Sequence, residues 1–187
     1  MFLSHPTTWR CIQSGKRRRR AAWLIVLTVA SSHTLAAEVV SGGLGLSRNA
    51  WETKHGKADS QCPGGLPYTC YERGKHWVSY MSNYIWLMEV YVVPLPYTSK
   101  TRGIGIEESR SLSKQYVPAD GRLVKTYRNE SGSTIDLYMS ESLKSLASVL
   151  PARGLNIWSG GEVGNFIVIH SSGDSVTRIV IGTGNNP

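Results

Sequence analysis

The stretch GLGLSRNAWETKHG, residues 43–56, contains both the start and the stop signals of a short helix. Ser47 is a favourable N-cap because its hydroxyl can accept a backbone N–H from the open first turn. Gly56 favours the left-handed conformation in which many helices end, and His55 places a basic side chain in the last turn. We therefore predict a helix between these two residues, with Trp51 packed into the core.

The phrase GIGIEE at 103–108 repeats the opening of this stretch. We predict a second helix from it, with Ile106, Leu112 and Tyr116 on one side, running to about Val117, where Pro118 stops it. The repeat suggests two related tandem halves, residues 38–102 and 103–187. The glycines fit neither of the common phosphate-loop spacings, so the stretch is not interpreted as a nucleotide site.

Three pairs of segments rich in β-branched and aromatic residues predict β-hairpins: 75–81 with 84–93, 122–128 with 133–139, and 165–170 with 176–181. In the second hairpin, alternation predicts that the face bearing Asp136 is exposed to water. Apolar residues at helical spacing between Ser140 and Leu150 predict a further helix. Helices followed by hairpins are typical of an α+β fold, an antiparallel sheet of hairpins with short helices packed on one face.

Residues 1–37 have the three parts of a secretory signal peptide: a basic run at 16–20, an apolar run at 21–30 and small residues ending at Ala37. The apolar run is shorter than the roughly 20 residues that span a bilayer. We therefore expect a secreted or extracytoplasmic protein, in the periplasm or at the cell exterior, with no stable membrane span after cleavage. An uncleaved N-terminal anchor remains the alternative.

The excess of positive charge belongs to this N-terminal segment. It holds six of the 21 basic residues and no acidic residue, so 15 basic residues face 13 acidic residues in the rest of the chain. The remaining net charge of +2 gives no support to nucleic-acid binding, and we expect no nucleic-acid partner.

The cysteines and histidines indicate a disulfide rather than a metal site. Cys62 and Cys70 flank a turn-rich segment and would pair in an oxidising compartment. Only His55, His76 and His170 follow the signal segment, and no C-x-x-C or H-E-x-x-H motif occurs. We predict no metal site and no cofactor.

The first hairpin is strongly aromatic, and both of its faces carry apolar side chains. An ordinary strand buried on both sides explains this pattern. The alternative is a recognition surface, for which the candidate binding residues are Trp77, Tyr80, Tyr84, Trp86 and Tyr91. That surface would bind another exported protein.

Catalytic groups are weakly represented. Ser172 and Asp174 near His170 are the nearest approach to a hydrolase cluster, but these residue types are expected in a hairpin turn. No G-x-S-x-G motif is present, and no catalytic residue is predicted. We therefore expect a non-enzymatic binding or structural protein; the alternatives are a secreted hydrolase and an extracytoplasmic small-ligand-binding protein.

Two resemblances accompany these residues. The pattern of Gly45, Leu46, Ser47, Trp51, His55 and Gly56 followed by a hairpin resembles the SmpA/OmlA and β-lactamase-inhibitor-protein-like group. That resemblance implies an exported bacterial protein built from α+β halves whose sheet presents an aromatic face to a protein partner. The second half lacks the closing glycine. The segment 158–168 and the ending at 184–187 resemble uncharacterised secreted bacterial proteins, which implies export but no activity.

Overall fold

The computed structural model describes residues 39–62, 67–96, 102–150, 158, 161–171, 173 and 175–185. The predicted signal peptide, residues 1–37, lies outside these residues. Within the part of the chain that is described, no helix combines the length and the apolar character needed to span a membrane.

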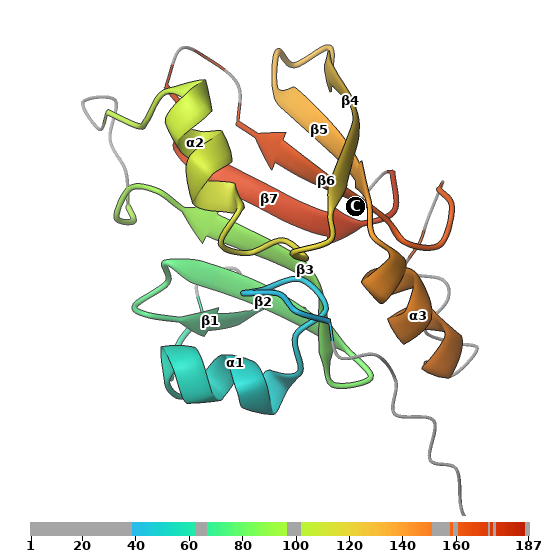
Figure 1. Cartoon of the computed structure of the whole chain (residues 1–187). Helices are drawn as coiled ribbons and strands as arrows, with labels where there is room; N and C mark the ends of the chain where they lie inside the picture. Colours follow the sequence, from blue (N-terminus) through green and yellow to red (C-terminus); the bar gives the residue numbers. More distant parts are fainter. Residues whose placement is uncertain are drawn as a thin grey trace, which may run out of the picture. The chain divides into compact units, whose positions relative to one another are not determined.

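The described strands form one antiparallel sheet in the order β1-β2-β3-β7-β6-β5-β4 (Figure 1). Their bounds are β1 Thr69–Tyr71, β2 His76–Met81, β3 Tyr84–Tyr91, β4 Arg122–Arg128, β5 Thr134–Met139, β6 Asn165–His170 and β7 Arg178–Thr183. The three predicted hairpins are present as β2–β3, β4–β5 and β6–β7. Pairing of β3 with β7 joins strands from both predicted halves in one sheet.

Three helices accompany the sheet: α1 Arg48–His55, α2 Ile106–Ser113 and α3 Glu141–Val149. The predicted caps of α1 are confirmed, because the Ser47 hydroxyl accepts a hydrogen bond from the Ala50 N–H and Gly56 has a φ of 82°. The Ser140 hydroxyl caps α3 in the same way. Together with the antiparallel sheet, these helices confirm the α+β fold class.

The residues preceding α1 are attached directly to the sheet. Gly45 N–H donates to the Ile85 carbonyl at 2.8 Å, and Ile85 N–H donates to the Leu46 carbonyl at 2.9 Å. Gly45 has a φ of 82°, and a Cβ there would lie 2.8 Å from the Leu143 side chain. Glycine is required at this position by both the backbone conformation and the close approach of α3.

The second helix is shorter than predicted. α2 ends at Ser113 rather than near Val117, because the following N–H groups of Gln115 and Tyr116 bond three residues back in tight turns. Tyr116 is nevertheless buried in the main core. The apolar spacing identified side chains that pack against the core, although Ile106 and Leu112 are only partly buried; it predicted neither the end of the helix nor the burial of Ser109 and Ser113.

The sheet has two different faces. The face toward the helices carries the main apolar core, which includes Trp51 from α1, Val78 from β2, Leu143 from α3 and Phe166 from β6. Register places a second row of side chains on the opposite face, running across five strands through Trp77, Glu89, Val180, Ile169 and Ile135. The candidate site lies at the Trp77 end of this row.

Candidate functional site

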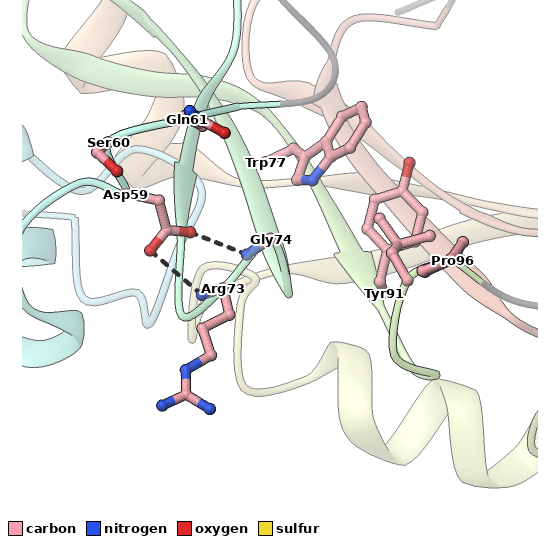
Figure 2. Close-up of a pocket in the computed structure, with 9 residues that line it drawn as sticks. Asp59, Ser60, Gln61, Arg73, Gly74, Trp77, Tyr91 and Pro96 are labelled. Atoms are coloured by element: carbon pink, nitrogen blue, oxygen red, sulfur yellow. Dashed lines mark hydrogen bonds between the residues drawn. The ribbon is translucent and has the colours of Figure 1, made fainter.

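A cavity with a volume of about 650 Å³ opens beside β2 and β3 (Figure 2). Strand residues form its wall, and the segments that follow α1 and β3 form its two rims. The described residues that line it are Asp59, Ser60, Gln61, Arg73, Gly74, Trp77, Tyr91, Leu95 and Pro96. This volume lies within the range of about 300–1,000 Å³ that is usual for small-molecule sites.

Two aromatic rings make the wall of the cavity. Trp77 and Tyr91 have ring centroids 5.0 Å apart, and the centroid of the Tyr68 ring lies 5.8 Å from that of Trp77. Trp77 is half-buried, and its buried Nε1–H finds no hydrogen-bond acceptor among the described residues. The exposed part of the wall is therefore mainly the apolar faces of the two rings.

A buried carboxylate, that of Glu89, holds the two tyrosine rings in place. Glu89 accepts hydrogen bonds from the hydroxyls of Tyr68 and Tyr91, both at 3.0 Å, and from Arg178 at 3.2 Å. Burial, together with the adjacent Glu89 charge, raises the pKa of Tyr68 to about 12, and burial also raises the pKa of Tyr91. Both tyrosines are therefore neutral donors at physiological pH, and the wall is preorganised.

The rim that follows α1 is fixed by three bonds. Asp59 N–H donates to the Cys70 carbonyl at 2.8 Å, and the Asp59 carboxylate accepts from the N–H groups of Arg73 and Gly74 at 3.2 and 2.9 Å (Figure 2). The predicted disulfide between Cys62 and Cys70 is present, with its Cα atoms 5.2 Å apart. This disulfide is of the kind that persists in oxidising, extracytoplasmic compartments.

The five aromatic residues named from the sequence do not form one surface. Trp77 and Tyr91 lie together in the cavity, whereas Tyr80, Tyr84 and Trp86 are half-buried against the main core. The alternation of side chains along each strand accounts for this division, because Trp77 lies an odd number of positions from Tyr80, and Tyr91 lies an odd number of positions from Tyr84 and Trp86. The hydroxyl of Tyr80 is bonded to the hydroxyl of Tyr71 at 2.8 Å.

Ser109 of α2, His170 of β6 and Asp136 of β5 form a buried cluster between the helix and the sheet. The Ser109 hydroxyl lies 2.6 Å from His170 Nδ1, and His170 Nε2 lies 3.4 Å from Asp136 Oδ2. All three side chains are at most 1 % exposed. A substrate cannot reach Ser109 there, so the cluster does not resemble a working hydrolase site. Ser172 and Asp174, the hydrolase candidates from the sequence, lie outside the described residues.

The prediction that the Asp136 face of β5 is exposed to water is wrong. Arg110 of α2 binds the Asp136 carboxylate through Nε and Nη2 at 2.9 and 3.1 Å, and Thr126 donates to it at 2.6 Å. Burial acts to raise the pKa of Asp136, but these donors outweigh it and hold the pKa below its usual value. Alternation in the sequence therefore does not distinguish a buried, paired carboxylate from one that is exposed to water.

His170 makes the stability of the protein depend on pH. Burial lowers its pKa below the value of about 6.5 expected in the unfolded chain. The unfolded state therefore binds more protons below that pH, and the free energy of unfolding should fall as the pH drops from 7.5 to 5. Urea denaturation at several pH values in the presence of a chelator measures this slope.

The matched variant for this prediction is His170→Asn, which retains a polar group facing Ser109 but cannot titrate. Its slope should be smaller than that of the wild type, and His76 should contribute to the remaining slope, because burial lowers the His76 pKa to about 4. An unchanged slope in the variant would show that His170 is not held neutral by the fold.

A second group of polar side chains lies near the cavity, on the helix side of the sheet. His55, Glu72 and His76 each place one potential ligand atom within 4.8 Å of the others. Sequence analysis missed this cluster because its members are 17 and 4 positions apart and match no metal motif. The tight turn between β1 and β2 brings them together.

Comparisons with known proteins give little further information. No protein-family model matches the sequence, and no curated protein matches it either. A solved structure of a cysteine-rich secretory protein from Staphylococcus aureus subsp. aureus Mu50 shares 14 % identity over 79 % of this chain, with a TM-score of 0.33. The chain spans 46 % of the length of that protein.

Proposed function

We propose that this chain is an exported, non-enzymatic binding protein whose ligand site is the cavity bounded by Trp77, Tyr91 and Pro96. The ligand class that fits the lining is a small neutral molecule with a hydroxylated ring, such as a mono- or disaccharide. The cavity beside Trp77 is the observation that carries the proposal, because it joins an aromatic wall to a polar rim.

The chemistry of the lining supports this ligand class. A sugar ring has an apolar C–H face, which can lie on Trp77, and hydroxyls at its edge, which can bond to Ser60, Gln61 and Asp59. Asp59 and Arg73 carry opposite charges on the same rim, so the described lining has no net charge that would select an ion.

The buried position of Ser109 and His170 also supports binding over hydrolysis. Their hydrogen bond lies behind α2, whereas the cavity opens beside β2 and β3 on the opposite face of the sheet. The alternative of a secreted hydrolase would need a nucleophile and base that a substrate can reach.

Calorimetric titration with a panel of mono- and disaccharides tests the proposal. At least one sugar should bind saturably to the wild type. Trp77→Ala should weaken the affinity for that sugar by about tenfold, as expected from the loss of roughly 1.4 kcal/mol of ring contact. Trp86→Ala is the matched control, because it removes an indole from the neighbouring strand outside the cavity lining.

Two results would contradict the proposal: no saturable binding of any sugar in the panel, or equal weakening of sugar binding by both tryptophan variants.

Binding of another exported protein through Tyr84 and Trp86 stays a prediction from the sequence. A partner captured by the wild type and lost in Tyr84→Ala and Trp86→Ala, but retained in Trp77→Ala, would favour that function instead.

A further inference from the structure

The strongest unassigned feature is the side-chain cluster formed by His55 at the end of α1, Glu72 in the β1–β2 turn and His76 at the start of β2. His55 Nδ1 lies 2.6 Å from Glu72 Oε1, and His76 Nδ1 lies 3.6 Å from Glu72 Oε2. We propose that these three side chains bind one divalent transition-metal ion of the zinc class. This site shares no ligand with the proposed sugar cavity and does not depend on it.

His76 is the observation that points to a ligand. Its side chain is 1 % exposed, yet Nδ1 has no hydrogen-bond partner among the described residues and faces Glu72. The other ring nitrogen, Nε2, lies 3.1 Å from the Tyr116 hydroxyl. A metal-binding histidine characteristically uses its second nitrogen in this way, which fixes the tautomer and aims the first nitrogen at the ion.

The remaining ligands are also held by their surroundings. Trp51, which is fully buried, stacks on His55 at 3.8 Å and meets His76 edge-on at 5.4 Å. Asp59 accepts hydrogen bonds from two N–H groups of the β1–β2 turn, and Glu72 occupies that turn with a φ of 52°. The backbone thus keeps the Glu72 carboxylate over the two imidazoles.

The three potential ligand atoms lie within 4.8 Å of one another, so modest side-chain movements would bring them to the spacing of a three-ligand site. Bonds of about 2.0–2.1 Å at tetrahedral angles separate ligand atoms by roughly 3.3 Å. The gap between His76 and Glu72 is close to this spacing, and the contact between His55 and Glu72 must lengthen by about 0.7 Å as the ion replaces their hydrogen bond. Glu72 is 36 % exposed and can move by that amount.

The donor set selects the class of ion. Two imidazoles and one carboxylate suit Zn²⁺ and its neighbours, whereas Mg²⁺ and Ca²⁺ prefer oxygen ligands throughout. Three protein ligands leave a fourth position for water or for another molecule. Lys75 lies 3.6 Å from Glu72, but its side chain is 52 % exposed and can turn into solvent when the ion binds.

Calorimetry with Zn²⁺ alone tests the site on the purified, untagged protein after treatment with a chelator. The wild type should bind one Zn²⁺ per chain, and bound Zn²⁺ should raise its melting temperature. Glu72→Gln and His55→Gln should each weaken binding by about 100-fold or more, since loss of a direct ligand should exceed the 10–100-fold effect of outer-shell partners. Mg²⁺ should not bind.

The control is Glu108→Gln, which removes an exposed carboxylate on α2 and should leave Zn²⁺ binding unchanged. Glu72→Gln alters an exposed side chain and keeps the core intact, so circular dichroism of this variant separates loss of a ligand from loss of folding. Absence of saturable Zn²⁺ binding to the wild type would overturn the proposal. Equal affinity in the wild type and the folded Glu72→Gln protein would overturn it as well.

Discussion

Replacing Trp51 with alanine is expected to lower the free energy of unfolding by about 3–5 kcal/mol, the usual cost of truncating a buried aromatic residue. Trp51 is fully buried and contacts the rings of His55, Tyr71 and His76. Small domains are stable by only about 5–15 kcal/mol, so the change removes a large share of the total. Urea denaturation followed by circular dichroism measures it.

Trp51→Phe and Trp77→Ala provide the comparison for this prediction. The first retains an aromatic ring and should cost less than Trp51→Ala; the second removes a half-buried indole from the other face of the sheet and should also cost less. A loss below about 1 kcal/mol for Trp51→Ala would contradict the packing of α1 against the sheet.

Replacing Arg110 with alanine is expected to destabilise the fold by about 2–3 kcal/mol. The change leaves the Asp136 carboxylate, which is 1 % exposed, without its cationic partner, and orphaning a buried charge typically costs about 3–5 kcal/mol. Solvent reduces the cost here, because the Arg110 side chain is 31 % exposed. Chemical denaturation at neutral pH measures the loss.

Asp136→Asn in the Arg110→Ala background removes the orphaned charge and should restore part of the stability, which a double-mutant cycle quantifies. The control is Arg122→Ala, because the Arg122–Glu141 pair is 3.9 Å apart and largely exposed on both sides. Equal effects of Arg110→Ala and Arg122→Ala would show that the Asp136 pair is not buried in solution.

The sequence was most informative where structure depends on near neighbours. Ser47 and Gly56 mark the ends of α1, because capping involves atoms only a few residues away. Each hairpin joins strands adjacent in sequence, and the first turns at Ser82 and Asn83, both with positive φ. The three-residue strand β1 was missed because so short a segment carries no measurable alternation.

Long-range pairing could not be predicted in the same way. Strand β3 pairs with β7 about ninety residues later, and this pairing brings Arg178 to Glu89 behind the aromatic wall. No local pattern encodes that register. Asp136 likewise looked like an exposed residue because its partner Arg110 comes from a separate helix.

The same distinction between local and long-range structure applies to the candidate sites. Trp77 and Tyr91 were identified from composition, but composition alone does not show that alternation places them on the opposite face of the sheet from Tyr84 and Trp86. The metal cluster depends on the β1–β2 turn, which folds Glu72 back toward His55 across 17 positions. The loop residues Asp59 to Gln61 form a rim of the cavity, but no sequence pattern predicts that a loop will line a cavity.

The most direct test of the proposed function is a two-dimensional ¹H–¹⁵N NMR titration of the protein with the saccharide panel. The binding account predicts that the indole N–H signal of Trp77 and the backbone N–H signal of Gly74 shift saturably, while the indole signal of Trp51 stays in place. Shifts centred on Trp86 or Trp51, or no shift at Trp77 with any sugar, would contradict the assignment of the cavity as the ligand site.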